Sequence, residues 1–178
     1  MASLGDRMIR AAKLDKHLYE EVEADTGATR QAMLVVVLSS VAAGIGSAGL
    51  GGLTGLFFGA LAALAAWFVW AFLTYFIGTR LLPESQTEAD VGQLLRTTGF
   101  SSSPGLLRVL GIVPGFTGIV FLGCAVWMLV AMVIAVRQAL DYHGTGRAIA
   151  VCLIGWVVQV VIIGLVMWLL GIEPGPQP

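Results

Sequence analysis

The residues of this chain that could carry out chemistry are few and widely separated. Its two cysteines, Cys124 and Cys152, and its two histidines, His17 and His143, stand far apart in the sequence. A zinc site needs ligands at short, regular spacings, and covalent catalysis needs a nucleophile with a base within reach. The sequence contains neither pattern, so we predict no catalytic residue, no metal and no cofactor. The cysteines are interpreted as small apolar side chains within helices.

A single uncharged polar side chain, Gln159, interrupts a long apolar run near the C-terminus. Within lipid it must find a hydrogen-bond partner in the protein, because the bilayer core offers none. We interpret Gln159 as a link between helices and keep open the alternative that it lines a path for a small solute. Paths for ions or protons usually use Asp, Glu or His within the membrane. The longest apolar runs contain none of these residues, which argues against an ion-coupled transporter.

Three glycines at intervals of four residues, Gly51, Gly55 and Gly59, form a repeated Gly-x-x-x-Gly pattern. Small residues at this spacing let helix backbones approach closely in lipid, where packing drives association. We therefore predict a helix-packing face here, within the chain rather than between chains.

Charged residues recur at the boundaries of the apolar runs, and six of them are expected on one membrane face. Arg137 and Asp141 are four residues apart, a spacing that suits an ion pair on a helix. The group either fastens the loops to one another or presents a docking surface for a partner protein or an anionic lipid. Its members are Arg80, Asp90, Arg96, Arg137, Asp141 and Arg147.

The composition places these residues in a membrane protein. Apolar residues make up 57% of the 178 residues and charged residues 12%, against about half and a quarter in a soluble domain. No charge occurs between Arg30 and Arg80, a run of 49 residues, whereas one membrane helix needs about 20. The formal net charge of -1 gives no basic excess that would indicate nucleic-acid binding.

We predict an all-α integral membrane protein, a five-helix transmembrane bundle with a cytoplasmic amphipathic helix at its N-terminus. The membrane domain covers residues 32–170, with spans at 32–48, 53–77, 91–112, 116–136 and 148–170. It follows an N-terminal segment, 1–31, and precedes an extended tail, 171–178. The third span is polar, and Pro104, which lacks an amide donor, is expected to kink it. We expect the other four spans to shield it as the packing centre.

The basic residues decide between four and five spans, because cytoplasmic loops are enriched in Lys and Arg. With five spans, all of the basic residues except Arg108 fall on the side of the N-terminus. We therefore expect a protein of the cell membrane with its N-terminus in the cytoplasm and its C-terminus outside. Arg108 falls on the far side, where its side chain is expected to extend towards the lipid headgroups.

The N-terminal segment is too highly charged to be the apolar core of a secretory signal. Its apolar residues recur at roughly helical spacing, which predicts one amphipathic helix. This helix lies either on the membrane surface or in water, and the sequence leaves both open. The apolar positions are Leu4, Met8, Ala11, Leu18, Tyr19 and Val22.

The sequence Gly-Phe-Ser-Ser-Ser-Pro at residues 99–104 lies in the third predicted span. Together with the five spans and the orientation, it resembles the Yip1 domain family, and in particular its bacterial branch. Gly99, Phe100 and Pro104 match the Gly-Tyr-x-x-x-Pro signature of that family, with Phe in place of Tyr. The likeness covers roughly residues 10–170 and implies a non-enzymatic integral membrane protein.

For eukaryotic members the resemblance implies a role in vesicle traffic through binding of prenylated GTPases. Their Asp-Leu-Tyr-Gly-Pro motif is absent here, with only Leu18 and Tyr19 similar, so GTPase binding does not carry over. We expect a scaffold or adaptor that contacts membrane lipids and other integral membrane proteins or itself, as a subunit of a larger complex. The alternative is a small-solute channel or transporter that uses the polar third span and Gln159.

Overall fold

The computed structural model is all-helical and describes residues 2–47, 52–169 and 171. Gly51 of the glycine pattern, the ends of the predicted spans at 48 and 170, and residues 172–178 of the predicted tail lie outside these residues. The elements are α1 (Leu4–Ala12), α2 (Lys16–Ala24), α3 (Ala28–Gly46), α4 (Gly52–Phe76), the π-helical η1 (Ile77–Leu81), α5 (Val91–Phe100), the 3-10 helical η2 (Ser103–Ile112), α6 (Thr117–Ala139) and α7 (Thr145–Leu169).

Four helices of the described residues are long and apolar enough to cross a membrane: α3, α4 with η1, α6 and α7. Large apolar side chains remain exposed along them, among them Phe57, Leu122 and Trp156. Lipid is as apolar as these side chains and leaves little driving force to bury them. The chain is therefore a multi-pass membrane protein.

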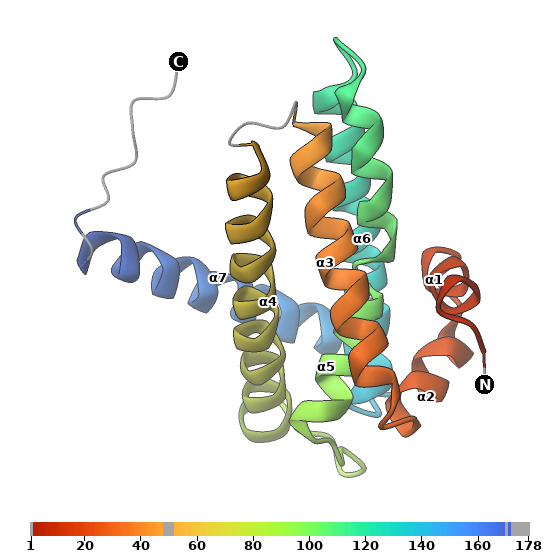
Figure 1. The fold of residues 1–178 in the computed structure, drawn as a ribbon. Helices are drawn as coiled ribbons and strands as arrows, with labels where there is room; N and C mark the ends of the chain where they lie inside the picture. The colour runs from red at the N-terminus through yellow and green to blue at the C-terminus, as the bar shows by residue number, and fades with distance from the viewer. Residues whose placement is uncertain (1, 48–51, 170, 172–178) are drawn as a thin grey trace.

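Helices α3 and α4 run side by side, and α6 packs against η2, which lies along α3. Helix α7 turns away from these helices (Figure 1). The buried residues of α7 all belong to its first half: Ala148, Val151, Cys152 and Gly155. Only the first half of α7, the fifth predicted span, therefore packs in the bundle.

The N-terminal segment forms two helices, not the single helix that its apolar pattern predicts. The break falls at Leu14, whose backbone φ is positive, at 61°, and the Asp15 carboxylate caps the start of α2 by accepting from the backbone N–H of His17 at 3.0 Å. Leu18, Tyr19 and Val22 are fully buried in the hydrophobic core with α3 and α5 residues. The apolar stripe of α2 therefore packs on protein, and neither lipid nor water covers it.

The third predicted span consists of two unlike helices joined at Ser101 and Ser102. It runs along α3 from that helix's second turn to its end, because three close contacts follow one another along α3. These pair Ala32 with Gly99, Ser39 with Gly105, and Gly46 with Arg108. Ten residues of α-helix and ten of 3-10 helix extend about 35 Å, and the 19 residues of α3 about 28 Å.

The two parts of this segment differ in burial. Every residue of α5 from Leu94 to Phe100 is buried, whereas η2 exposes Leu107, Leu110 and Ile112. The expectation that the other helices shield the whole segment is therefore wrong for η2. Only α5 and the first turn of η2 form a packing centre.

Candidate functional site

The signature residues Gly99, Phe100 and Pro104 all lie in the core, at the junction of α5 and η2. A methyl group on Gly99 would lie 2.7 Å from the Cβ atom of Ala32, so the glycine sets the distance between α3 and α5. Pro104 occupies the first turn of η2, where a missing backbone N–H costs little. These residues position helices and line neither the intramembrane cavity nor the charged hollow described below.

Hydroxyl groups replace the helical hydrogen bonds that this junction interrupts. The Ser101 hydroxyl donates to the carbonyl of Thr98 at 2.6 Å, and the Ser103 hydroxyl donates to the carbonyl of Phe100 at 2.7 Å. Ser102 turns away from these carbonyls and lines a cavity. The serine run therefore both allows the change of helix type and supplies a polar wall.

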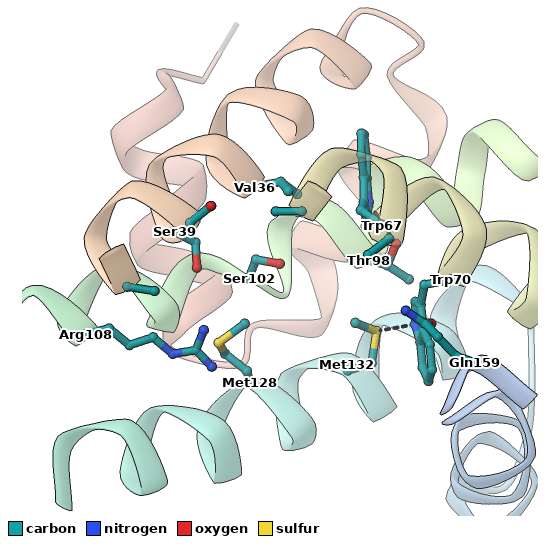
Figure 2. A pocket seen from close by; sticks show the side chains of 14 residues that line it. Val36, Ser39, Trp67, Trp70, Thr98, Ser102, Arg108, Met128, Met132 and Gln159 are labelled. Carbon is teal, nitrogen blue, oxygen red and sulfur yellow. Dashed lines mark hydrogen bonds between the residues drawn. The ribbon is translucent and has the colours of Figure 1, made fainter. Parts of the chain in front are cut away.

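The intramembrane cavity has a volume of about 340 Å³ and is lined by residues of α3, α4, α5, η2, α6 and α7 (Figure 2). Its tryptophans are fixed: Trp67 Nε1 donates to Thr98 Oγ1 at 3.2 Å, and Trp70 Nε1 lies 3.2 Å from the sulfur of Met132. Its polar lining consists of Ser39, Ser40, Thr98, Ser102, Arg108 and Gln159. The sequence analysis grouped Gln159 with the polar third span, but it did not place Ser39, Ser40 or Arg108 beside them, because these residues are far from Gln159 in the chain.

Two polar atoms at this cavity, Arg108 Nε and Gln159 Oε1, are buried without a hydrogen-bond partner among the described residues. Gln159 is therefore not the link between helices that we predicted. The Arg108 side chain lies beside Met128 and Ser39 at the cavity (Figure 2). It does not extend towards the headgroups as expected, because its guanidinium packs over the Phe121 ring, 5.6 Å from the ring centroid.

The six charged residues predicted to form one group do not form one, because each makes different contacts. Asp90 caps α5 in a reciprocal arrangement with Gln93. Arg96 is only 6% exposed, and its Nε atom donates to the backbone carbonyls of Val22 at 2.9 Å and Glu23 at 3.1 Å. Arg96 therefore holds the C-terminal end of α2 against α5.

The predicted pair of Arg137 and Asp141 is not formed. Arg137 instead donates to the carbonyls of Tyr142 and His143, at 3.2 and 2.8 Å. Asp141 adopts a positive φ of 52°, which ends the helix before its carboxylate can face Arg137. Arg80 is exposed on η1 and makes no ion pair within the part of the chain that the structure describes.

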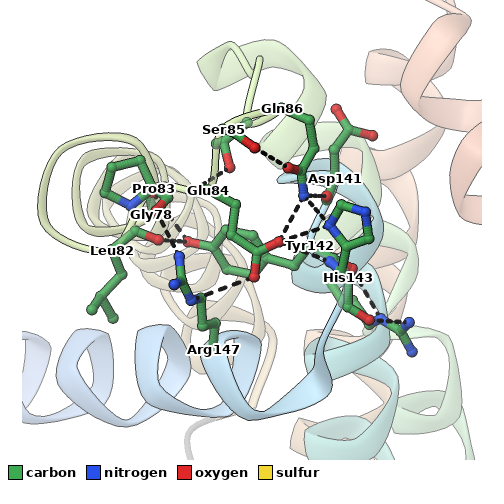
Figure 3. A network of polar contacts seen from close by, with 12 residues as sticks. Gly78, Leu82, Pro83, Glu84, Ser85, Gln86, Asp141, Tyr142, His143 and Arg147 are labelled. Atoms are coloured by element: carbon green, nitrogen blue, oxygen red, sulfur yellow. Dashed lines mark hydrogen bonds and ion pairs between the residues drawn. The ribbon is translucent and has the colours of Figure 1, made fainter.

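A loop residue that the sequence did not single out, Glu84, ties two connections together (Figure 3). Its Oε2 accepts from the backbone N–H of His143 at 3.0 Å, and its Oε1 lies 3.4 Å from Arg147 Nε. Hydrogen bonds from His143 hold the pKa of Glu84 well below its ordinary value, at about 2. Arg147 also donates to the Pro83 carbonyl at 2.6 Å, so the η1–α5 and α6–α7 connections form one polar unit.

A second network missed from the sequence joins the N-terminal helix pair, α1 and α2. Arg7 is buried and bridges Glu21 at 2.9 Å and Asp25 at 2.7 Å. Arg10 bridges Asp15 at 2.8 Å and Glu21 at 2.5 Å. The run of acidic residues at 20–25 could have indicated this network, because so many neighbouring carboxylates need nearby cations to offset their repulsion. Arg7 and Arg10 supply these cations.

The glycine pattern of α4 is not buried within the molecule. Gly55 and Gly59 are exposed, and a methyl group on Gly59 would meet no atom within 4 Å. The close approaches between helices use Gly46, Gly99 and Gly105 instead. The prediction that Gly55 and Gly59 form a packing face within the chain is therefore wrong.

Comparison with family models identifies the family of this chain. The model of the Yip1 domain matches residues 17–170, which confirms the resemblance drawn from the signature and the spans. No curated protein and no solved structure matches the chain.

Proposed function

The chain belongs to the Yip1 domain family, and we propose that it is a membrane scaffold or adaptor without catalytic activity of its own. The observation that carries this proposal is the N-terminal helix pair, which ion pairs hold together and which Arg96 fixes to α5 at the end of the bundle. A polar surface attached so firmly to a set of lipid-facing helices is suited to present contacts to another protein.

The proposed orientation has five spans in the cell membrane, an N-terminus in the cytoplasm and a C-terminus outside. Its support is the course of α5 and η2 along α3 and the concentration of Lys and Arg on one side. The irregular backbone of this third crossing is tolerable because α3 and α6 pack against it.

The partner surface that we propose is a charged hollow of about 380 Å³ between α2 and the end of α6. It carries both signs of charge, which suits a polar segment of another integral membrane protein or a second copy of this chain. Gln138 Nε2 donates to Glu20 at 2.9 Å across it, so its two walls are held in place. Its lining includes Lys16, His17, Glu20, Gln138, Asp141 and His143.

Site-specific photo-crosslinking in native membranes tests this role. A crosslinker at His17, whose side chain is 81% exposed, should give discrete adducts of defined mass. The matched control is Leu153, which is 59% exposed on the lipid-facing surface of α7, and it should give lipid adducts alone. Equal protein adducts at both positions, or none at His17, would contradict the proposal.

The intramembrane cavity favours a second candidate, a small-solute channel or transporter lined by Gln159 and the third segment. Proteoliposomes distinguish the two functions. A transporter should show solute flux that Gln159→Leu abolishes, whereas a scaffold should show no flux with either chain.

A further inference from the structure

Arg108 places a positive charge inside the bundle, near one end of its helices. Its guanidinium packs over Phe121, which lies four residues after the start of α6, or about 6 Å along the helix axis. The backbone of Arg108 touches Gly46, the last residue of α3. The charge therefore lies about one turn inside the helix ends, at the outer part of the intramembrane cavity.

This charge has no counter-ion among the described residues. None of the ion pairs or side-chain hydrogen bonds of the described chain involves Arg108, and α3, α4, η2, α6 and α7 contain no Asp or Glu. An unpaired cation in the membrane is costly, and such residues mark ligand sites or paths. The missing partner is expected to be an anion from outside the chain.

Neutral donors face the same space. The hydroxyls of Ser39 and Ser102 line the cavity, and neither forms a side-chain hydrogen bond within the described residues, unlike Ser101 and Ser103. Gly105 brings η2 close to Ser39, because any larger residue would overlap the Ser39 hydroxyl. A guanidinium with two unused hydroxyls is the donor set that phosphate oxygens require.

We propose that the intramembrane cavity binds the phosphate group of an anionic phospholipid, with Arg108 as the charged ligand and Ser39 and Ser102 as neutral donors. The volume of about 340 Å³ lies at the lower end of the range of ligand sites, about 300–1,000 Å³. It admits a headgroup, while the acyl chains stay in the bilayer over the exposed Leu107 and Leu110 of η2. The site is independent of the scaffold role and is read out separately from it.

Native mass spectrometry of the purified full chain in detergent tests this site. The protein is titrated with phosphatidylglycerol, with phosphatidylcholine, and with phosphatidylglycerol in the presence of inorganic phosphate. Wild type is expected to bind phosphatidylglycerol at least roughly tenfold more tightly than phosphatidylcholine, and Arg108→Gln to lose this preference, in line with a charge-assisted hydrogen bond. If inorganic phosphate displaces phosphatidylglycerol, the ligand of this site is the free anion. If inorganic phosphate does not displace it, the ligand is the lipid.

Two further variants make the test independent of folding defects. Arg80→Gln removes the same charge from an exposed position and should keep the preference. Arg108→Lys keeps the charge but lacks the planar fork, so it should keep part of the preference. The proposal is overturned if wild type does not distinguish the two lipids, or if both Arg108 variants bind phosphatidylglycerol as wild type does.

Discussion

Gly99 determines how closely α5 approaches α3. The Gly99→Ala variant would place its Cβ atom 2.7 Å from the Ala32 Cβ atom and 3.2 Å from the Ala32 carbonyl oxygen. A backbone oxygen cannot move aside as a flexible side chain can, so the helices must separate. We expect the free energy of unfolding to fall by about 1–3 kcal/mol, the usual cost of overpacking a core.

Thermal unfolding monitored with a thiol-reactive dye checks this expectation, because both cysteines are shielded until the bundle opens. Cys124 and Cys152 are 5% and 4% exposed. The matched control is Gly123→Ala on α6, where an added methyl group meets nothing within 4 Å. A lower midpoint for Gly99→Ala with an unchanged one for Gly123→Ala is expected, and equal midpoints for all three proteins would refute the spacing role.

Arg96 should be the residue whose loss frees the N-terminal helix pair. Arg96→Gln leaves the carbonyls of Val22 and Glu23 without their buried donor, at a cost of about 1–3 kcal/mol. Amide hydrogen exchange in α1 and α2 should therefore accelerate roughly 5- to 150-fold. Exchange in α6 should stay unchanged, and acceleration throughout the molecule would indicate global unfolding instead.

The packing of α2 on α5 and α6 is expected to depend on pH, because Glu23 of α2 changes its protonation state. Burial raises the pKa of Glu23 from 4.5 to about 7, helped by the neighbouring charge of Asp141 and opposed by Arg96, with smaller effects of Glu20 and Asp90. The docked helix therefore holds the proton more tightly than the free one. Docking is strongest below about pH 4.5 and weakens as the pH rises to about 7.

Hydrogen exchange of α2 at pH 6 and pH 8, corrected for the intrinsic exchange rate, measures this dependence. We expect more protection at pH 6 in wild type and equal protection at both values in Glu23→Gln. Glu20→Gln, at a position 56% exposed, should behave as wild type. If Glu23→Gln still shows the pH dependence, the effect belongs to Asp141 instead, because burial also raises the pKa of Asp141.

The same helix illustrates what an amphipathic pattern can predict. The spacing of Leu18, Tyr19 and Val22 correctly indicated a helix with one buried face. It did not indicate that the face is covered by α5 and α6, because lipid and protein interiors favour the same apolar residues. The break at Leu14 was not predicted either, since a leucine at positive φ has no signal in sequence.

The sequence predicted the long apolar helices well and the polar contacts poorly. An uncharged apolar run long enough to cross the membrane must form a helix, because only a helix satisfies all of its backbone hydrogen bonds internally. The predicted bounds of α3, α4, α6 and α7 therefore lie within a few residues of those in the structure. The partners of Arg7 and Arg96 belong to other parts of the chain, which the spacing of charges along the sequence does not bring together. Charge spacing alone could not select a backbone carbonyl, as for Arg137, over a carboxylate four residues away.

For the whole molecule, the course of α5 and η2 predicts that the two ends of the chain lie in different compartments. A C-terminal alkaline phosphatase fusion should be active, because the enzyme folds only outside the cytoplasm, and a fusion placed after Asp141 should be inactive. Green fluorescent protein at the same two points should give the reverse pattern. An inactive C-terminal phosphatase with a fluorescent C-terminal fusion would exclude five spans.

The contact between Arg96 and Val22 also imposes an order on biosynthesis. The two residues are 74 positions apart, so at about 5–20 residues per second the ribosome needs about 4–15 s to supply the donor after the acceptor. During this interval the apolar side of α2 lacks α5 and α6, the two helices on which it packs. The N-terminal helix pair can therefore dock fully only after α3 and α4 have been made and α5 has emerged.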